Sequence, residues 1–299
     1  MVKVVIIGNV GVDVVLGPLN NWPAWGYETI VKEYSIRFTG AAGNVATVLS
    51  ALNIEPWLIS AIGKDKFGEI FKNIYSNLGV KTEYLKEIDG STCISVGVKN
   101  TKSERSFITH LGVLEKVHMV KICKNYNFTD AIVLICGINL VPSMRTEEFY
   151  RFVRDLSNKA FILMDPGCPL ENWNEFREIL AKFLPYVDIF LPNEEEFLNF
   201  MDMNNLESAL EHYHKRYKTT TVIKLGAVGA VMVRDGVSKL VPVDPINNIK
   251  DTIGAGDAFN AGLIHALAEK KLLDVEGIHH ASTIAGKWIS GHFWRGMPF

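Results

Sequence analysis

The chain has few cysteines, and none of them lie at metal-binding spacing. Cys93, Cys123, Cys136 and Cys168 are scattered over 299 residues, with no Cys-x-x-Cys pair. With four scattered cysteines in a chain of this length and no Cys-x-x-Cys pair, neither a disulfide framework nor a zinc site is indicated. We therefore expect a reduced, cytoplasmic setting.

The sequence also lacks an excess of positive charge and a long apolar run. Lys and Arg total 31 against 33 for Asp and Glu, a net charge of −2, and no basic run exceeds a few residues. Nucleic acid is therefore not an expected partner. The apolar start at residues 2–7 is broken by Gly8, which makes it too short for a signal sequence or a membrane span. No membrane association is expected.

Apolar periodicity predicts strands that alternate with helices. Residues 45–52, 67–78 and 149–156 place apolar side chains at helical spacing, and Gly79 stands where a helix-ending glycine belongs. Runs rich in β-branched or other apolar residues predict strands at residues 4–7, 131–135, 160–164, 187–191, 221–225 and 230–233. This alternation predicts an α/β fold with a mostly parallel central sheet built from right-handed crossovers.

Two β-rich stretches interrupt the alternation, at about residues 14–38 and 92–110. They could pair into a small accessory sheet. Such a sheet could be a lid that folds over a cleft, or a surface decoration without function. No Ser/Gly-rich linker separates either stretch from the rest, so we expect one domain over residues 1–299.

Three expected strands are followed by polar or glycine-bearing turns. These are Asp165-Pro166-Gly167, Pro192-Asn193 and residues 226–229. Ligands of open parallel sheets bind outside the carboxyl ends of the strands, so these turns should line one edge. A fourth loop, residues 254–257, should lie beside them.

That fourth loop is the most informative segment of the chain. It reads Gly254-Ala255-Gly256-Asp257 and opens a run with apolar residues at helical spacing. Small residues at a helix N-terminus leave backbone N–H groups free to bind a phosphate. A carboxylate at such a site either caps the helix or takes a proton from a hydroxyl that attacks the phosphate.

The whole string Asp251-Thr-Ile-Gly-Ala-Gly-Asp257 resembles the C-terminal signature of the ribokinase-like (PfkB-type) carbohydrate kinases. The resemblance implies a three-layer α/β/α fold with a small β-sheet lid, and ATP as phosphoryl donor. It implies that Asp257 accepts the proton of the acceptor hydroxyl. The amides of Ala255, Gly256 and Asp257, in the loop opened by Gly254, would hold the charge that grows on the γ-phosphoryl group.

Further segments match the family in family order. Asn193 and Glu196 have capping-box spacing, and the resemblance adds a role in holding hydrated Mg²⁺. The family's nucleotide-contact loop matches Lys224, Gly226, Ala227 and Gly229, and adenine is expected near residues 282–287. By resemblance to some relatives, Asp251 and Thr252 would help to bind a monovalent cation such as K⁺.

The N-terminal half supplies the acceptor site. Asp13, at the end of the segment that follows the first strand, could accept two hydroxyl hydrogen bonds. By resemblance, Asn9, Asp13, Gly40 and Asn44 contact the acceptor. Residues 62–68 match a further family element. The chain departs from the family at Thr39, where glycine is usual, and this leaves the identity of the sugar open.

The expected reaction is ATP-dependent phosphorylation of a primary hydroxyl of a sugar or related polyol. A nucleoside kinase is an alternative, because aromatic residues such as Trp22, Trp25 and Phe107 could stack on a base or pack the lid into a second subunit. A 2-keto-3-deoxygluconate kinase is another, because Arg105 in the lid could face an acidic acceptor. A homodimer through the lid is expected. A non-catalytic sensor on the same scaffold is the alternative from another class. An N-terminal Gly8-x-x-Gly11 does not fit the spacing of a dinucleotide-binding oxidoreductase.

Overall fold

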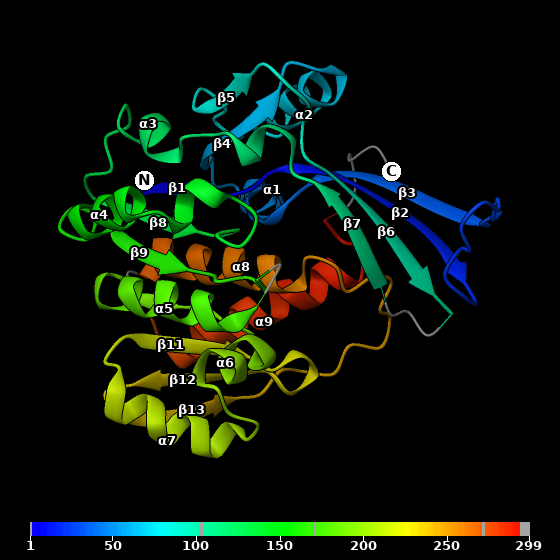
Figure 1. Cartoon of the computed structure of the whole chain (residues 1–299). Coiled ribbons are helices and arrows are strands. Elements are labelled where there is room, and N and C mark those ends of the chain that lie inside the picture. Colours follow the sequence, from blue (N-terminus) through cyan, green and yellow to red (C-terminus); the bar gives the residue numbers. More distant parts are fainter. Residues whose placement is uncertain (1, 102–104, 170–171, 271–272, 294–299) are drawn as a thin grey trace.

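A nine-stranded sheet forms the centre of the computed structural model, which describes residues 2–101, 105–169, 172–270 and 273–293 (Figure 1). Seven neighbouring strands run parallel, and the two strands at one edge each pair antiparallel with their neighbours. In spatial order the strands are β13 (Val237–Val241), β12 (Ala230–Arg234), β11 (Thr220–Lys224), β10 (Ile189–Phe190), β9 (Phe161–Met164), β8 (Ala131–Ile135), β1 (Lys3–Ile7), β4 (Trp57–Gly63) and β5 (Leu85–Ile88). The predicted parallel sheet is confirmed.

Helices cover both faces of this sheet and make three layers. Side chains alternate along each buried strand, so Val4 and Ile6 of β1 face one core while Val5 and Ile7 face the other. On the first face lie α1 (Ala41–Ala51), α2 (Lys66–Asn77), α8 (Ala255–Lys270) and α9 (Val275–Ile289). On the second lie α3 (Met119–Cys123), α4 (Glu147–Leu156), α5 (Trp173–Phe183), α6 (Glu194–Met201) and α7 (Leu206–Arg216).

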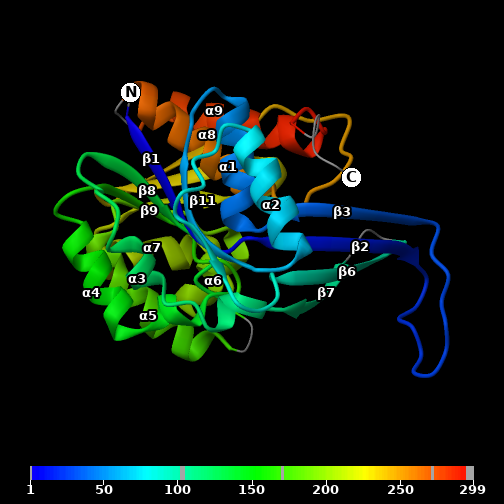
Figure 2. The same cartoon turned by 90° about the horizontal axis from the view of Figure 1, so that it is seen from above.

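A second, four-stranded sheet extends to one side of the main sheet (Figure 2). Its order is β3 (Glu33–Thr39), β2 (Gly11–Leu19), β6 (Ile94–Asn100) and β7 (Arg105–His110). The two β-rich stretches of the sequence therefore pair with each other, through parallel β2 and β6. The connection expected at residues 102–104 lies outside the described residues. Movement of this sheet as a lid stays a prediction.

The predicted helices and strands form as helices and strands, but the bounds of most of them differ from the predicted ones. Each of the six predicted strands forms, but β10 is only two residues long. The strand β4 was not among the predicted strands, and Ser60 interrupts its otherwise apolar run. That hydroxyl is fully buried and donates to the Gly8 carbonyl over 2.6 Å, so a polar residue is satisfied inside the sheet. β13 was also missed, because its edge position leaves Val237 and Leu240 exposed.

The carboxyl ends of the parallel strands lie along one side of the main sheet, where α8 begins and the second sheet is located (Figure 1). Gly8, Asp165, Asn193 and Gly226 all follow strands at this edge. The fold thus brings the predicted turns together at the carboxyl ends. Among the described helices, none combines the length and apolar character needed to cross a membrane.

Candidate active site

The loop before α8 is shaped by a glycine in the left-handed region. Gly254 has φ 78°, and a Cβ there would lie 3.0 Å from both Asn44 Nδ2 and Trp288 Nε1. Its carbonyl accepts the Ala258 N–H at 2.9 Å, which starts the helix. A larger residue would be strained and would also push Asn44 away, so glycine fixes the approach of α1 to α8.

The first turn of α8 offers fewer free amides than expected. The Ala255 N–H donates to the Thr252 carbonyl at 3.2 Å. Within the described part of the chain, the N–H groups of Gly256 and Asp257 have no acceptor. These two amides, together with the positive end of α8, could therefore bind an anion.

Asp257 lies inside the first turn of α8 rather than before it, so it is not the N-cap. Its Oδ2 accepts a hydrogen bond from Asn44 Nδ2 at 2.7 Å. Burial, together with the nearby charge of Asp165, raises the pKa of Asp257 to about 7. A carboxylate with this pKa is suited to accept a proton near neutral pH.

Lys224 is held by Asp165, whose turn was expected at this edge, and by Asn260, which the sequence analysis did not select. Its Nζ donates to Asp165 Oδ2 at 2.7 Å and lies 3.5 Å from Asn260 Oδ1. Asn260 Nδ2 donates to the same Asp165 oxygen at 2.6 Å. The carboxylates of Asp165 and Glu196 raise the pKa of Lys224 although burial opposes this. Asn260 stands one helical turn after Asp257, a spacing that could have identified it.

Asn193 and Glu196 form the predicted capping box. Asn193 Oδ1 accepts the Glu196 N–H, and Glu196 Oε2 accepts the Asn193 N–H, both at 2.8 Å. Burial and the charge of Asp165 raise the pKa of Glu196 to about 7. Glu196, Asp165 and Asp257 thus interact electrostatically around the single ammonium of Lys224, and the cluster has more acidic than basic groups.

This donor set fits a hydrated magnesium ion that arrives with a nucleotide. Carboxylate and amide oxygens suit Mg²⁺, which keeps several waters and shares phosphate oxygens. A binding cation would also offset the surplus negative charge that raises the pKa of Glu196. In the described residues there is no cluster of three or more His, Cys, Asp or Glu that could hold a metal unaided.

The residues predicted to contact the acceptor are linked to Asp257 through the side chain of Asn44. Asn9 Oδ1 and Asn44 Oδ1 are buried without a hydrogen-bond partner in the described part of the protein. Such unsatisfied oxygens are costly unless a ligand donates to them. Burial raises the pKa of Asp13, although its Oδ2 accepts the Thr39 hydroxyl at 2.8 Å. Gly40 precedes α1 with φ 88°, and a Cβ there would meet the Asn9 carbonyl at 2.7 Å.

A cavity of about 490 Å³ lies on the nucleotide side. One wall combines the predicted nucleotide loop with the start of α8, and the other is mostly apolar but includes Asp244. The first wall contains Lys224, Gly226, Ala227, Gly229, Thr252, Ala255 and Gly256. The second contains Val243, Pro245, Ile246, Ile249, Ser282, Ala285 and Ile289. An apolar slot beside an anion site suits a purine with its phosphates.

Three of the predicted residues contact other side chains in the structure. The guanidinium of Arg105, on β7, forms a salt bridge with Asp251 rather than standing free toward an acceptor. Asp251 is also paired with Arg37, which the sequence analysis did not select. The Thr252 hydroxyl lies 3.4 Å from Arg105 Nη1.

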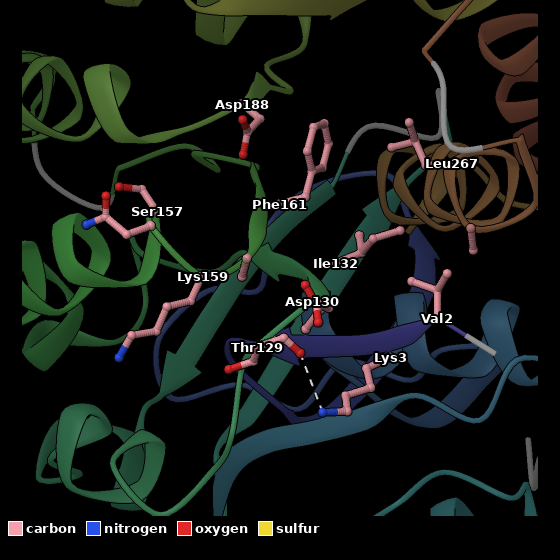
Figure 3. A pocket seen from close by; sticks show the side chains of 14 residues that line it. Val2, Lys3, Thr129, Asp130, Ile132, Ser157, Lys159, Phe161, Asp188 and Leu267 are labelled. Atoms are coloured by element: carbon pink, nitrogen blue, oxygen red, sulfur yellow. Dashed lines mark hydrogen bonds between the residues drawn. The ribbon is translucent and has the colours of Figure 1, made fainter.

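A larger and more open hollow, of about 1040 Å³, lies at the opposite end of the sheet (Figure 3). It surrounds the amino ends of β1, β8 and β9. Its polar groups are partly engaged by backbone, since Lys3 Nζ donates to the Thr129 carbonyl and Asp188 accepts the Ile162 N–H. None of the predicted site residues lines it, so we place the chemistry at the carboxyl edge.

An anion-binding helix start, an embedded carboxylate and an apolar slot together define a phosphotransferase acting on an alcohol. A family model described as pfkB family carbohydrate kinase matches residues 1–285. The chain belongs to this family of carbohydrate kinases, which confirms the predicted class.

Relatives of known name support this assignment. Adenosine kinase 2 of Arabidopsis thaliana is 31% identical over 270 residues, which cover 83% of this chain and 77% of the relative. A fructokinase of Vibrio alginolyticus is 30% identical over 77% of this chain and 76% of its own. The structure of Arabidopsis thaliana ribokinase with ribose and ATP has a TM-score of 0.80 at 20% identity, covering 100% of this chain and 96% of that chain. The predicted ribokinase-like fold is confirmed.

Proposed function

We propose that this kinase transfers the γ-phosphoryl group of ATP to a hydroxyl of a sugar or nucleoside held between Asp257 and the second sheet. One observation carries the proposal. The half-buried Asp257 carboxylate lies at the start of α8, close to two unpaired backbone amides and an unsatisfied Asn44 oxygen. A proton acceptor, an anion site and an acceptor-binding amide are therefore adjacent.

In the proposed reaction the acceptor hydroxyl gives its proton to Asp257. Its oxygen forms a bond to the γ-phosphorus, while the bond from that phosphorus to the bridging oxygen breaks and ADP leaves. The amides of Gly256 and Asp257 stabilise the charge on the transferring group. Lys224, held by Asp165 and Asn260, supplies a fixed positive charge beside Gly256, where a Cβ would lie 3.5 Å from its Nζ.

Mg²⁺ would be held through water by Glu196 and Asn193, and it would neutralise phosphate charge. The protein's own contribution at this point is the capping box, which fixes both side chains at the end of β10. Glu196 is 8% exposed, so its carboxylate is in place before nucleotide binds.

The acceptor is a neutral polyol or nucleoside rather than an acid. Arg105 is the residue that would have favoured 2-keto-3-deoxygluconate, and its guanidinium is paired with Asp251. Phe107 of β7 is 47% exposed and packs against Gly97 on the neighbouring strand. Phe107 and Asp13 lie on the same face of the second sheet. The ring could therefore stack on a base, which supports a nucleoside as the second candidate.

The test is a panel of acceptors assayed for acceptor-dependent ADP formation. Fructose, ribose, adenosine, inositol and 2-keto-3-deoxygluconate cover the alternatives. Phosphorylation of a neutral acceptor supports the proposal, while turnover only with the keto-acid would overturn the choice of acceptor. Tight nucleotide binding with no turnover on any acceptor would instead favour a sensor.

We further propose a homodimer through the second sheet. Val14, Ile36, Val96 and Ile108 lie opposite one another across its four strands and form an apolar row. Ile108 is 62% exposed at the end of this row, and a contiguous apolar row on a surface suits contact with another subunit. Sedimentation should give a dimer for the native chain and a monomer for Ile108→Glu, and a native monomer would refute the proposal.

The cysteines support a cytoplasmic setting. All four thiols are free, and Cys93, Cys123 and Cys136 are buried. Disulfides are rare in reducing compartments, where free thiols persist. Fractionation of cells that express the protein would test this location.

A further inference from the structure

Asp251 is clamped between two arginines. Its Oδ2 lies 2.5 Å from Arg37 Nη2, and its Oδ1 lies 2.5 Å from Arg105 Nη2. The three side chains are 11%, 10% and 17% exposed, respectively. This is a shielded cluster of charges, in which one carboxylate interacts with two guanidinium groups.

The two arginines come from opposite edges of the second sheet. Arg37 is on β3 and Arg105 on β7, the outer strands of the order β3-β2-β6-β7. Asp251 belongs instead to the loop that leads into α8. Both edges of the second sheet are therefore anchored to one residue of the phosphate-binding loop.

The clamp continues into the backbone of that loop. Asp251 Oδ1 also accepts the Ile253 N–H at 2.9 Å. The Ile253 carbonyl accepts the indole N–H of Trp288 at 2.6 Å. Gly254 and the two free amides follow directly, so the orientation of the Asp251 carboxylate constrains the turn that presents those amides.

The same carboxylate is where the family resemblance implies a monovalent cation. The residues do not fit that role here, because each carboxylate oxygen is already paired with a guanidinium. Although burial opposes ionisation, the Ile253 N–H and the two arginines hold the pKa of Asp251 below its usual range. A K⁺ ion would have to displace one of the two guanidinium groups from Asp251. It would then lie beside the positive charge of the other guanidinium group.

We infer that Arg37 and Arg105 replace the monovalent cation, and that they act as positioning residues that fix the phosphate-binding loop when the second sheet is docked. The inference rests on the proposed kinase function. Two consequences follow. Catalysis needs no K⁺, and loss of either guanidinium loosens the loop without removing a group that touches the nucleotide.

The first experiment uses the native enzyme and exchanges K⁺ for tetramethylammonium at constant ionic strength. We expect kcat to change less than about twofold, since no alkali-metal site is left to fill. Thallium(I), used as a K⁺ probe in ²⁰⁵Tl NMR, should show no bound signal that K⁺ displaces. Activation by K⁺ of about tenfold or more, or a K⁺-displaceable thallium signal, would overturn the inference.

The second experiment compares Arg37→Met and Arg105→Met with Lys99→Met as a matched control. Lys99 pairs with Arg105 across β6 and β7 but contacts Glu33 at the surface. For the arginine variants we expect kcat to fall about tenfold or more with acceptor KM nearly unchanged, and added guanidinium ion to restore part of it. Lys99→Met should behave as the native protein. Arginine variants indistinguishable from Lys99→Met would contradict the inference.

Hydrogen exchange separates this inference from the proposed function. Residues 251–257 should exchange faster in Arg37→Met and Arg105→Met than in Lys99→Met, and Arg105→Lys should be intermediate. This readout and the thallium titration need no turnover. If no acceptor is phosphorylated, the kinase proposal fails while the clamp is still tested. Unchanged exchange in the arginine variants would reject the clamp even in an active kinase.

Discussion

Asn44 donates a 2.7 Å hydrogen bond to the carboxylate of Asp257, and so joins residues 213 positions apart at the centre of the site. The bond connects the start of α1 to the start of α8. Burial and the charge of Asp165 raise the pKa of Asp257, while this hydrogen bond lowers it. Asn44 therefore both orients the carboxylate and keeps its pKa near neutrality.

The first prediction concerns pH. A general base works only when deprotonated, so activity should fall as the pH drops through the pKa of Asp257, about 7. We expect kcat/KM, measured with both substrates subsaturating, to decline about tenfold per pH unit below that value. Asp257→Asn should retain a residual activity, and titration of the nucleotide would still affect it. The pH profile of this variant should not show the decline at acidic pH. A profile that stays flat down to pH 5 in the native enzyme would contradict the prediction.

Replacing Asn44 by Leu should shift the acidic side of the pH–activity profile. Loss of the Nδ2 donor removes the interaction that lowers the pKa of Asp257, so the acid limb should shift to higher pH and the acceptor KM should rise. Thr47→Val is the matched control, because Thr47 is buried on the same helix but hydrogen-bonds Tyr75. A limb at the native position in Asn44→Leu would show that the hydrogen bond does not set the pKa.

The stability of the nucleotide-free protein should fall as pH rises from about 4 to about 7. Both Glu196 and Asp257 have folded pKa values of about 7, above their ordinary values of 4.5 and 3.8. The folded state thus binds more protons than the unfolded state across this window. Glu196→Gln should flatten the dependence of Tm on pH and raise Tm at pH 8. Exposed Glu194→Gln should leave the slope unchanged, because Glu194 is not among the groups that raise the pKa of Glu196. An equal slope for both variants would count against the prediction.

A bulky side chain in the apolar slot should weaken nucleotide binding selectively. Ala285 lines the 490 Å³ cavity, so Ala285→Phe should occupy the volume intended for the base. We expect Kd for ADP, measured by calorimetry, to rise by about tenfold or more. Lys287→Ala, on the exposed side of the same helix, serves as control. Unchanged ADP affinity in Ala285→Phe would place the nucleotide elsewhere.

Local patterns predicted most of the elements and much of the site. The alternation of apolar helical and β-branched segments predicted the parallel sheet, and the turns after its strands meet at one edge. The capping box from Asn193 to Glu196 was also predicted, because its spacing along the chain determines its geometry.

Contacts between distant segments could not be predicted in the same way. Asp165, which follows β9, and Asn260, in α8, both contact Lys224 although they are 95 residues apart in the sequence. Arg37 reaches Asp251 over 214 residues, through the pairing of the second sheet. No periodicity in the sequence specifies which of many surface arginines becomes buried beside a carboxylate. For this reason Arg105 was predicted to contact the acceptor, while in the structure it forms a salt bridge with Asp251.

Turnover of Asp257→Asn tests the central claim most directly. The substitution keeps the size of the side chain and its acceptor oxygen for Asn44, so the fold and ADP affinity should be retained. We expect acceptor-dependent ADP formation to fall by roughly two to four decades, the usual contribution of a positioned base. Near-native turnover in a folded, nucleotide-binding Asp257→Asn protein would contradict the assignment of Asp257 as the proton acceptor.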